Sequence, residues 1–79
     1  MLELTIPDNL WNTALAPEGI LERWRVQDGV NVNAGQVLAD LRIEDALHEL
    51  ISPSAGRLAI LVAQDDLIEP GTIVGQLRP

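Results

Sequence analysis

Cysteine, lysine, phenylalanine and tyrosine are all missing from this 79-residue chain, and each absence removes a class of chemistry. Without cysteine there is no disulfide framework, no cysteine-ligated zinc site and no thiol catalysis. Without lysine, no side chain can form a Schiff base or carry an amide-linked prosthetic group. The single histidine, His48, has neither a cysteine nor a second histidine as partner. We therefore predict no catalytic residue and no metal site.

Positive charge is also scarce, because five arginines stand against twelve acidic residues and the formal net charge is -7. Phosphate backbones and anionic lipid repel such a chain, so we expect neither nucleic acid nor a membrane as a partner. The longest apolar runs fall far short of the roughly 20 residues that span a bilayer. Residues 1–5 lack the basic and apolar regions of a signal peptide. A cytoplasmic location is the resulting expectation.

Aliphatic side chains are plentiful, since 47% of the residues are hydrophobic and only Trp11 and Trp24 are aromatic. That content suits a small packed core and is too apolar for a disordered acidic tail. A chain of this length holds one domain. We predict a single domain over residues 1–79 that is monomeric.

The apolar residues follow a period of two, which is typical of β-strands. In one such segment Ile20, Trp24 and Val26 are expected to share a face, with Glu22 as a polar exception. Residues 9–17 are expected to form a loop with at most one short turn, because prolines bracket them. Many short strands separated by turns predict an all-β barrel or sandwich. The alternating segments are residues 2–6, 20–26, 37–43, 58–62 and 73–77.

The chain contains an internal repeat. The pattern Gly19-x-Leu21-x-x-Trp24 recurs 37 residues later as Gly56-x-Leu58-x-x-Leu61, and Ala34-Gly35-x-Val37 recurs 36 residues later as Pro70-Gly71-x-Ile73. The change of spacing predicts that the second copy loses one residue in its loop. Each copy has one apolar face that it cannot bury alone, so two copies packed face to face predict a pseudo-two-fold sandwich. The turn at residues 44–46 should then lie opposite the two chain ends.

In this order the motifs resemble the lipoyl/biotinyl carrier domain family over nearly the whole chain. The resemblance implies a flattened β-barrel of two four-stranded antiparallel sheets, with a hairpin turn that bears the family's modified lysine. Counting back from Glu49 and Ser52-Pro53 places Asp45 in the lysine position, with Glu44 and Ala46 matching the lipoyl form. The methionines of the biotinyl form are absent. The matching segments are residues 19–26, 28–38, 43–46, 49–56 and 69–71.

Asp45 cannot replace the lysine chemically, because a carboxylate that attacks an acyl adenylate yields a labile anhydride instead of a stable amide. The first hypothesis is a non-enzymatic interaction or scaffold module without a cofactor, related to 2-oxo-acid dehydrogenase type complexes. Its protein partner would dock on Trp11, Glu44 and Asp45. The alternative is a swinging-arm carrier, lipoyl before biotinyl, in which Asp45 stands where the modified lysine belongs. A third hypothesis, the lipoyl-like part of a membrane-fusion adaptor, fits less well because a tight turn joins the two halves.

Several candidate residues have a structural interpretation beside the functional one. Trp11 is either an exposed docking side chain or a cap on the small core. Trp24 is expected in the core or at its rim. Asp65, Asp66 and Glu69 are more typical of a solvated acidic turn than of a calcium loop, because their spacing does not match the EF-hand.

Overall fold

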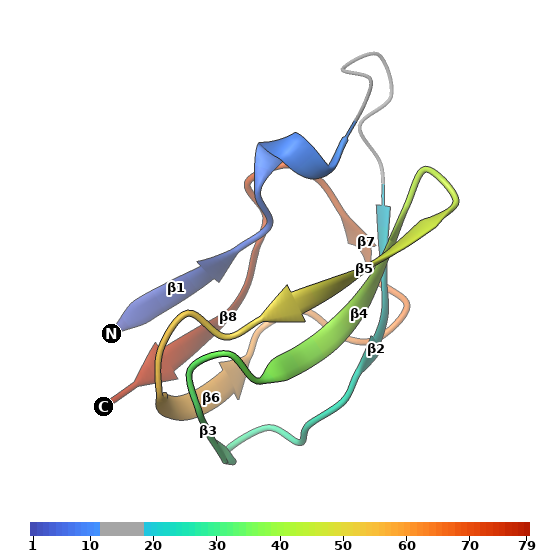
Figure 1. The fold of residues 1–79 in the computed structure, drawn as a ribbon. Coiled ribbons are helices and arrows are strands. Elements are labelled where there is room, and N and C mark those ends of the chain that lie inside the picture. The colour runs from blue at the N-terminus through green and yellow to red at the C-terminus, as the bar shows by residue number, and fades with distance from the viewer. Residues whose placement is uncertain (12–18) are drawn as a thin grey trace.

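The computed structural model describes residues 1–11 and 19–79, which form eight strands and one 3-10 turn (Figure 1). One sheet has the strand order β1-β8-β6-β3 and the other β5-β4-β2-β7, and every pairing is antiparallel. The predicted all-β sandwich of two four-stranded sheets is therefore confirmed. The elements are β1 (Leu2–Thr5), η1 (Asp8–Leu10), β2 (Gly19–Trp24), β3 (Asn31–Val32), β4 (Val37–Ile43), β5 (Ala46–Ile51), β6 (Gly56–Ile60), β7 (Leu67–Ile68) and β8 (Ile73–Arg78).

The core lies between the two sheets and consists mainly of aliphatic side chains, to which all eight strands contribute and β4 contributes most. Alternation along the strands sends every second side chain inward, which is why so short a chain can bury this set. Trp24 packs against the core from its rim and donates its indole N–H to the Val62 carbonyl at 2.8 Å, as the sequence predicts. The central side chains, all less than 2% exposed, include Ile6, Leu21, Leu38, Leu41, Ile43, Leu58, Ile68 and Val74.

The pseudo-two-fold relation between the halves is confirmed by matching backbone hydrogen bonds. Gly35 N–H donates to the Ser52 carbonyl at 2.8 Å, and Gly71 N–H donates to the Ile6 carbonyl at 2.9 Å. Both glycines have φ +85°, a left-handed conformation that side chains of L-residues rarely adopt. β4 and β5 therefore occupy the positions in one sheet that β8 and β1 occupy in the other.

The expected loss of one loop residue from the second copy is wrong, because the extra residue is a bulge in β2. The pairs Leu21↔Leu41 and Leu58↔Leu77 are equivalent, yet the next pair is Arg23↔Asp40 in one sheet and Ala59↔Gln76 in the other. Glu22 is skipped, and no shift occurs along β6. After the bulge, each side chain of β2 points to the opposite face of the sheet from the one that simple alternation would give it.

The expected face of this segment is wrong for the same reason. Ile20 is 37% exposed, whereas Leu21 is fully buried. Beyond the bulge the alternation changes phase, so Trp24 and Val26 pack against the core although Ile20 does not. A period-two pattern cannot reveal such a bulge, because the inserted residue merely appears as a polar exception.

The β4–β5 turn and the two chain ends lie on opposite sides of the molecule, as the repeat predicts (Figure 1). Within residues 1–11 and 19–79, no helix is both long and apolar enough to cross a membrane. The short turn η1 agrees with the loop expected from residue 9 onward, while the rest of that expected loop, residues 12–18, lies outside the described residues.

Candidate interaction site at the β4–β5 turn

The β4–β5 hairpin closes through a two-residue turn. Ile43 pairs with Ala46, and the loop residues Glu44 and Asp45 have φ angles of 52° and 66°. Two consecutive positive φ angles are the mark of a type I′ turn, whose twist matches that of the flanking strands. Aspartate tolerates this conformation better than most residues. The three residues of the predicted turn, Glu44, Asp45 and Ala46, are all exposed.

A row of exposed apolar side chains crosses the outer face of the sheet beside this turn. Leu47 on β5 pairs with Arg42 on β4, which pairs with Ile20 on β2, which pairs with Leu67 on β7. Leu47 is 62% exposed, Ile20 37% and Leu67 68%. The strand pairings thus bring three apolar side chains from distant parts of the sequence into one row. Sequence reasoning missed this row, because it depends on the registers of three strand pairs.

A shallow groove of about 220 Å³ joins the apolar row to the acidic turn. Its lining combines Ile20 and Leu67 with Arg42, Glu44 and Asp45. The Arg42 Nε–H donates to Glu22 Oε2 at 2.9 Å, so the arginine of the row is already paired. The β2 bulge makes this contact possible, because Glu22 and Arg23 both turn to the outer face. The excess charge at this end of the molecule is therefore negative.

Asp40 lies midway along β4, on the outer face of the same sheet. Its carboxylate accepts hydrogen bonds from Arg23 Nε at 2.8 Å and from Arg25 Nη2 at 2.6 Å. The hydrogen bond from Arg25, followed by that from Arg23, lowers the pKa of Asp40. Glu49 lies 3.4 Å from the same guanidinium of Arg25. Asp40 is therefore neutralised by the two arginines, and these three residues brace the sheet, while Glu49 is held only loosely at the edge of the cluster.

Trp11 is not the exposed docking side chain that one alternative predicted. It is 9% exposed and belongs to the core, where it follows η1 and donates its backbone N–H to the Asp8 carbonyl at 3.3 Å. The other alternative, a tryptophan that caps the small core, is what the structure shows. Of the three residues predicted to dock a partner, Glu44 and Asp45 are exposed and Trp11 is buried.

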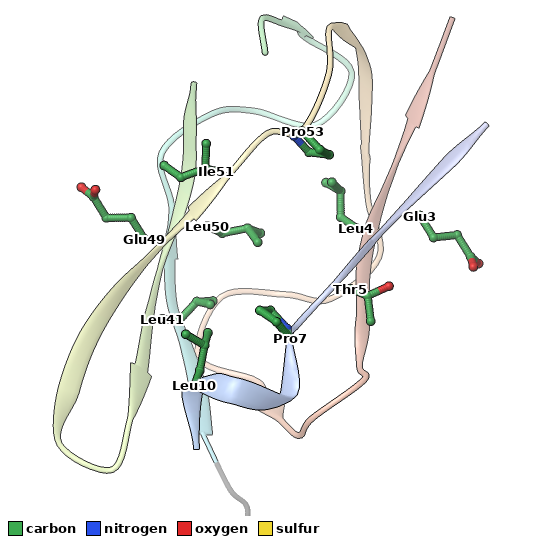
Figure 2. A pocket seen from close by; sticks show the side chains of 10 residues that line it. All are labelled: Glu3, Leu4, Thr5, Pro7, Leu10, Leu41, Glu49, Leu50, Ile51 and Pro53. Atoms are coloured by element: carbon green, nitrogen blue, oxygen red, sulfur yellow. The ribbon is translucent and has the colours of Figure 1, made fainter. Parts of the chain in front are cut away.

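A second groove, of about 380 Å³, opens between β1 and β5 (Figure 2). Leu4 and Leu50 point into it from the two strands, while Glu3 and Glu49 point away from it on either side (Figure 2). The pseudo-two-fold axis relates these walls, since Glu3-Leu4-x-x-Pro7 on one side matches Glu49-Leu50-x-x-Pro53 on the other. That match was open to sequence analysis and went unnoticed there.

Neither groove gathers catalytic chemistry from the part of the chain that the structure describes. Aliphatic side chains and carboxylates make up most of both linings, together with Thr5 in the larger groove and Arg42 in the smaller, and neither lining includes a histidine or serine. In residues 1–11 and 19–79 no group of three or more histidine, aspartate or glutamate side chains is placed to hold a metal ion. The acidic turn at Asp65 and Asp66 instead caps its own loop, because Asp66 Oδ2 accepts the Ala63 backbone N–H at 3.2 Å.

Comparison with known proteins agrees with this architecture. A family model described as "Biotin-requiring enzyme", the biotin/lipoyl family, matches residues 14–77. The solution structure of the lipoyl domain of the 2-oxoglutarate dehydrogenase complex from Azotobacter vinelandii is similar, with a TM-score of 0.76, 18% sequence identity and 96% of each chain covered. No curated protein matches the chain. Because the family model spans most of the sequence and the fold agrees, the chain belongs to the biotin/lipoyl attachment family.

Proposed function

We propose that this chain is a non-enzymatic interaction module that has the fold of a carrier domain but does not carry the prosthetic group. The observation that supports the proposal is chemical. The family attaches its group to a lysine, and this sequence has no lysine. Lipoyl and biotin do not fit the turn as it stands, because Glu44 and Asp45 offer carboxylates where amide formation needs an amine. No cofactor is therefore expected unless a lysine is restored at Asp45.

The partner surface that suits this module is basic and partly apolar. The chain has a net charge of -7, and its acidic turn adjoins the exposed row of Leu47, Ile20 and Leu67. Charge attraction would speed and orient the encounter, while burial of the apolar row would hold the complex. A component of a 2-oxo-acid dehydrogenase type assembly is the partner that the family resemblance favours.

Two measurements test the proposal together. Co-expression with lipoyl and biotin ligases, followed by intact mass determination, should show the unmodified chain. Affinity capture should then compare the wild type with Asp45→Lys, which reverses the charge of the turn without touching the core. Loss of captured proteins by the variant supports docking at the turn. An added mass on the wild type, or an identical set of proteins on both baits, contradicts the proposal.

The alternative is a swinging-arm carrier whose lysine is replaced at Asp45. It is favoured by one observation, the exposed two-residue turn at the end of the molecule opposite the chain ends. If this alternative holds, Asp45→Lys should become lipoylated in the same co-expression. The two hypotheses then differ in whether the wild-type chain binds partners at all.

A further inference from the structure

We propose that the free edge of β5 binds an extended peptide segment by strand addition, and that this segment alternates apolar, basic and apolar residues on its outer side. The inference deepens the proposed function by naming the chemistry of a partner. It uses the strand edge and not the turn, so its failure can be separated from failure of docking at Asp45.

The first argument is the position of β5 in its sheet. β5 is six residues long and pairs with β4 on one side only, as the strand order β5-β4-β2-β7 shows for the described residues. An edge strand presents a row of unpaired N–H and C=O groups, which an extended peptide can complete. The other three edge strands are shorter, since β1 has four residues and β3 and β7 have two each. β5 therefore offers the longest edge for an added strand.

The second argument is the pattern of side chains along this edge. On the outer face Leu47 and Ile51, 62% and 44% exposed, flank Glu49, whose side chain is 54% exposed. Across antiparallel or parallel partners, directly opposed side chains interact most strongly. The matching segment therefore has an apolar residue, a lysine or arginine, and another apolar residue at alternate positions. The pattern is symmetric and serves either strand direction.

The third argument concerns the charge of Glu49. Among residues 1–11 and 19–79 its ion-pair partner is Arg25 at 3.4 Å, and that guanidinium is more closely held by Asp40 at 2.6 Å. A basic residue on the incoming strand would approach Glu49 from its free side. β1 has Glu3 at the pseudo-equivalent position, but the position that corresponds to Ile51 is occupied by the polar Thr5.

The fourth argument is the space beside the edge. The groove of about 380 Å³ between β1 and β5 is lined by Leu4, Leu41, Leu50 and Pro53. An added strand would direct alternate side chains into this groove, because successive residues of a strand point to opposite faces. Apolar residues are therefore expected at the inward positions as well.

A second copy of the chain is a poor occupant. If two β5 strands paired antiparallel with Leu47 opposite Ile51, Glu49 would lie directly opposite its own copy. Opposed like charges destabilise a strand pair. Each copy also has a net charge of -7, which adds long-range repulsion. The edge thus discourages self-pairing and favours a basic segment.

The test uses the whole chain, labelled with nitrogen-15, and a capped seven-residue probe peptide. The probe has valine at positions 2 and 6, arginine at position 4, leucine at positions 3 and 5, and threonine at both ends. Titration should shift the amide signals of β5 and slow their hydrogen exchange. Replacing the arginine by glutamate should weaken binding about five- to thirty-fold, as expected for reversing one opposed charge pair. N-methylation of alternate probe amides should abolish binding.

Two matched variants assign the effect to the edge. Glu49→Gln should remove most of the difference between the arginine and glutamate probes. Glu3→Gln, at the pseudo-equivalent position on β1, should leave the difference unchanged. The proposal is overturned if β5 amides do not respond, if the N-methylated probe binds equally well, or if sedimentation shows that β5 pairs with a second copy. If the β5 amides do not respond, the role left for Glu49 is to prevent aggregation through the β5 edge.

Discussion

Substitution of Asp45 by lysine perturbs the turn in a way whose magnitude follows from the backbone. Asp45 has φ 66° in a turn where both loop residues are left-handed. Lysine lacks the short side chain that lets aspartate adopt this conformation, so the variant should lose about 1 kcal/mol of stability. The net charge rises by two units from -7, which relieves some repulsion at the acidic end. The fold should survive, because the side chain is exposed and no core contact changes.

Urea denaturation of Asp45→Lys beside Asp45→Asn measures this loss. The asparagine variant keeps a residue suited to left-handed backbone and should stay within about 0.5 kcal/mol of the wild type. The lysine variant, co-expressed with a lipoyl ligase, should gain the mass of one lipoyl group. A loss above about 3 kcal/mol would refute the turn geometry. A folded variant that stays unmodified would refute Asp45 as the attachment position.

Three further predictions concern the fold around the site. Gly35→Ala and Gly71→Ala should each lower the free energy of unfolding by about 1–2 kcal/mol. An added methyl group meets open space at both positions, so the only cost is the shared φ of +85°. A difference of more than about 2 kcal/mol between the two variants would contradict the pseudo-symmetry. Asp40→Asn should be less stable than the wild type near neutral pH. Since the folded pKa of Asp40 is lowered, that difference should shrink as pH falls below the ordinary aspartate pKa of about 3.9, and a difference independent of pH would exclude the arginine pairing. Trp24→Phe should lose about 0.5–1.5 kcal/mol with the indole hydrogen bond, and an unchanged urea midpoint would show that this bond contributes nothing.

The architecture could be predicted because several levels of the sequence agree. Alternation gives strands, the glycines at 35 and 71 give equivalent turns, and the repeat gives two packed halves. The turn at residues 44–46 follows from the same repeat, since it lies between the copies. These features depend on local backbone preference and on burial, both of which are written in short sequence patterns.

The remaining features depend on contacts between distant strands. A bulge at Glu22 looks like any polar interruption, so the phase of β2 could not be predicted. The row of Leu47, Ile20 and Leu67 exists only once three strand registers are known. Trp11 was open to two interpretations because a loop tryptophan can cap a core or face a partner equally well. Burial against the assembled core decides between them.

The measurement that tests the interaction module most directly compares three affinity baits, each analysed by quantitative mass spectrometry. Wild type and Leu61→Ser should capture the same proteins in the same amounts. Leu67→Ser should lose them, although Leu61 and Leu67 are similarly exposed at 56% and 68%, because only Leu67 lines the groove beside the acidic turn. Equal capture by all three baits, with each variant folded, would contradict docking at this face.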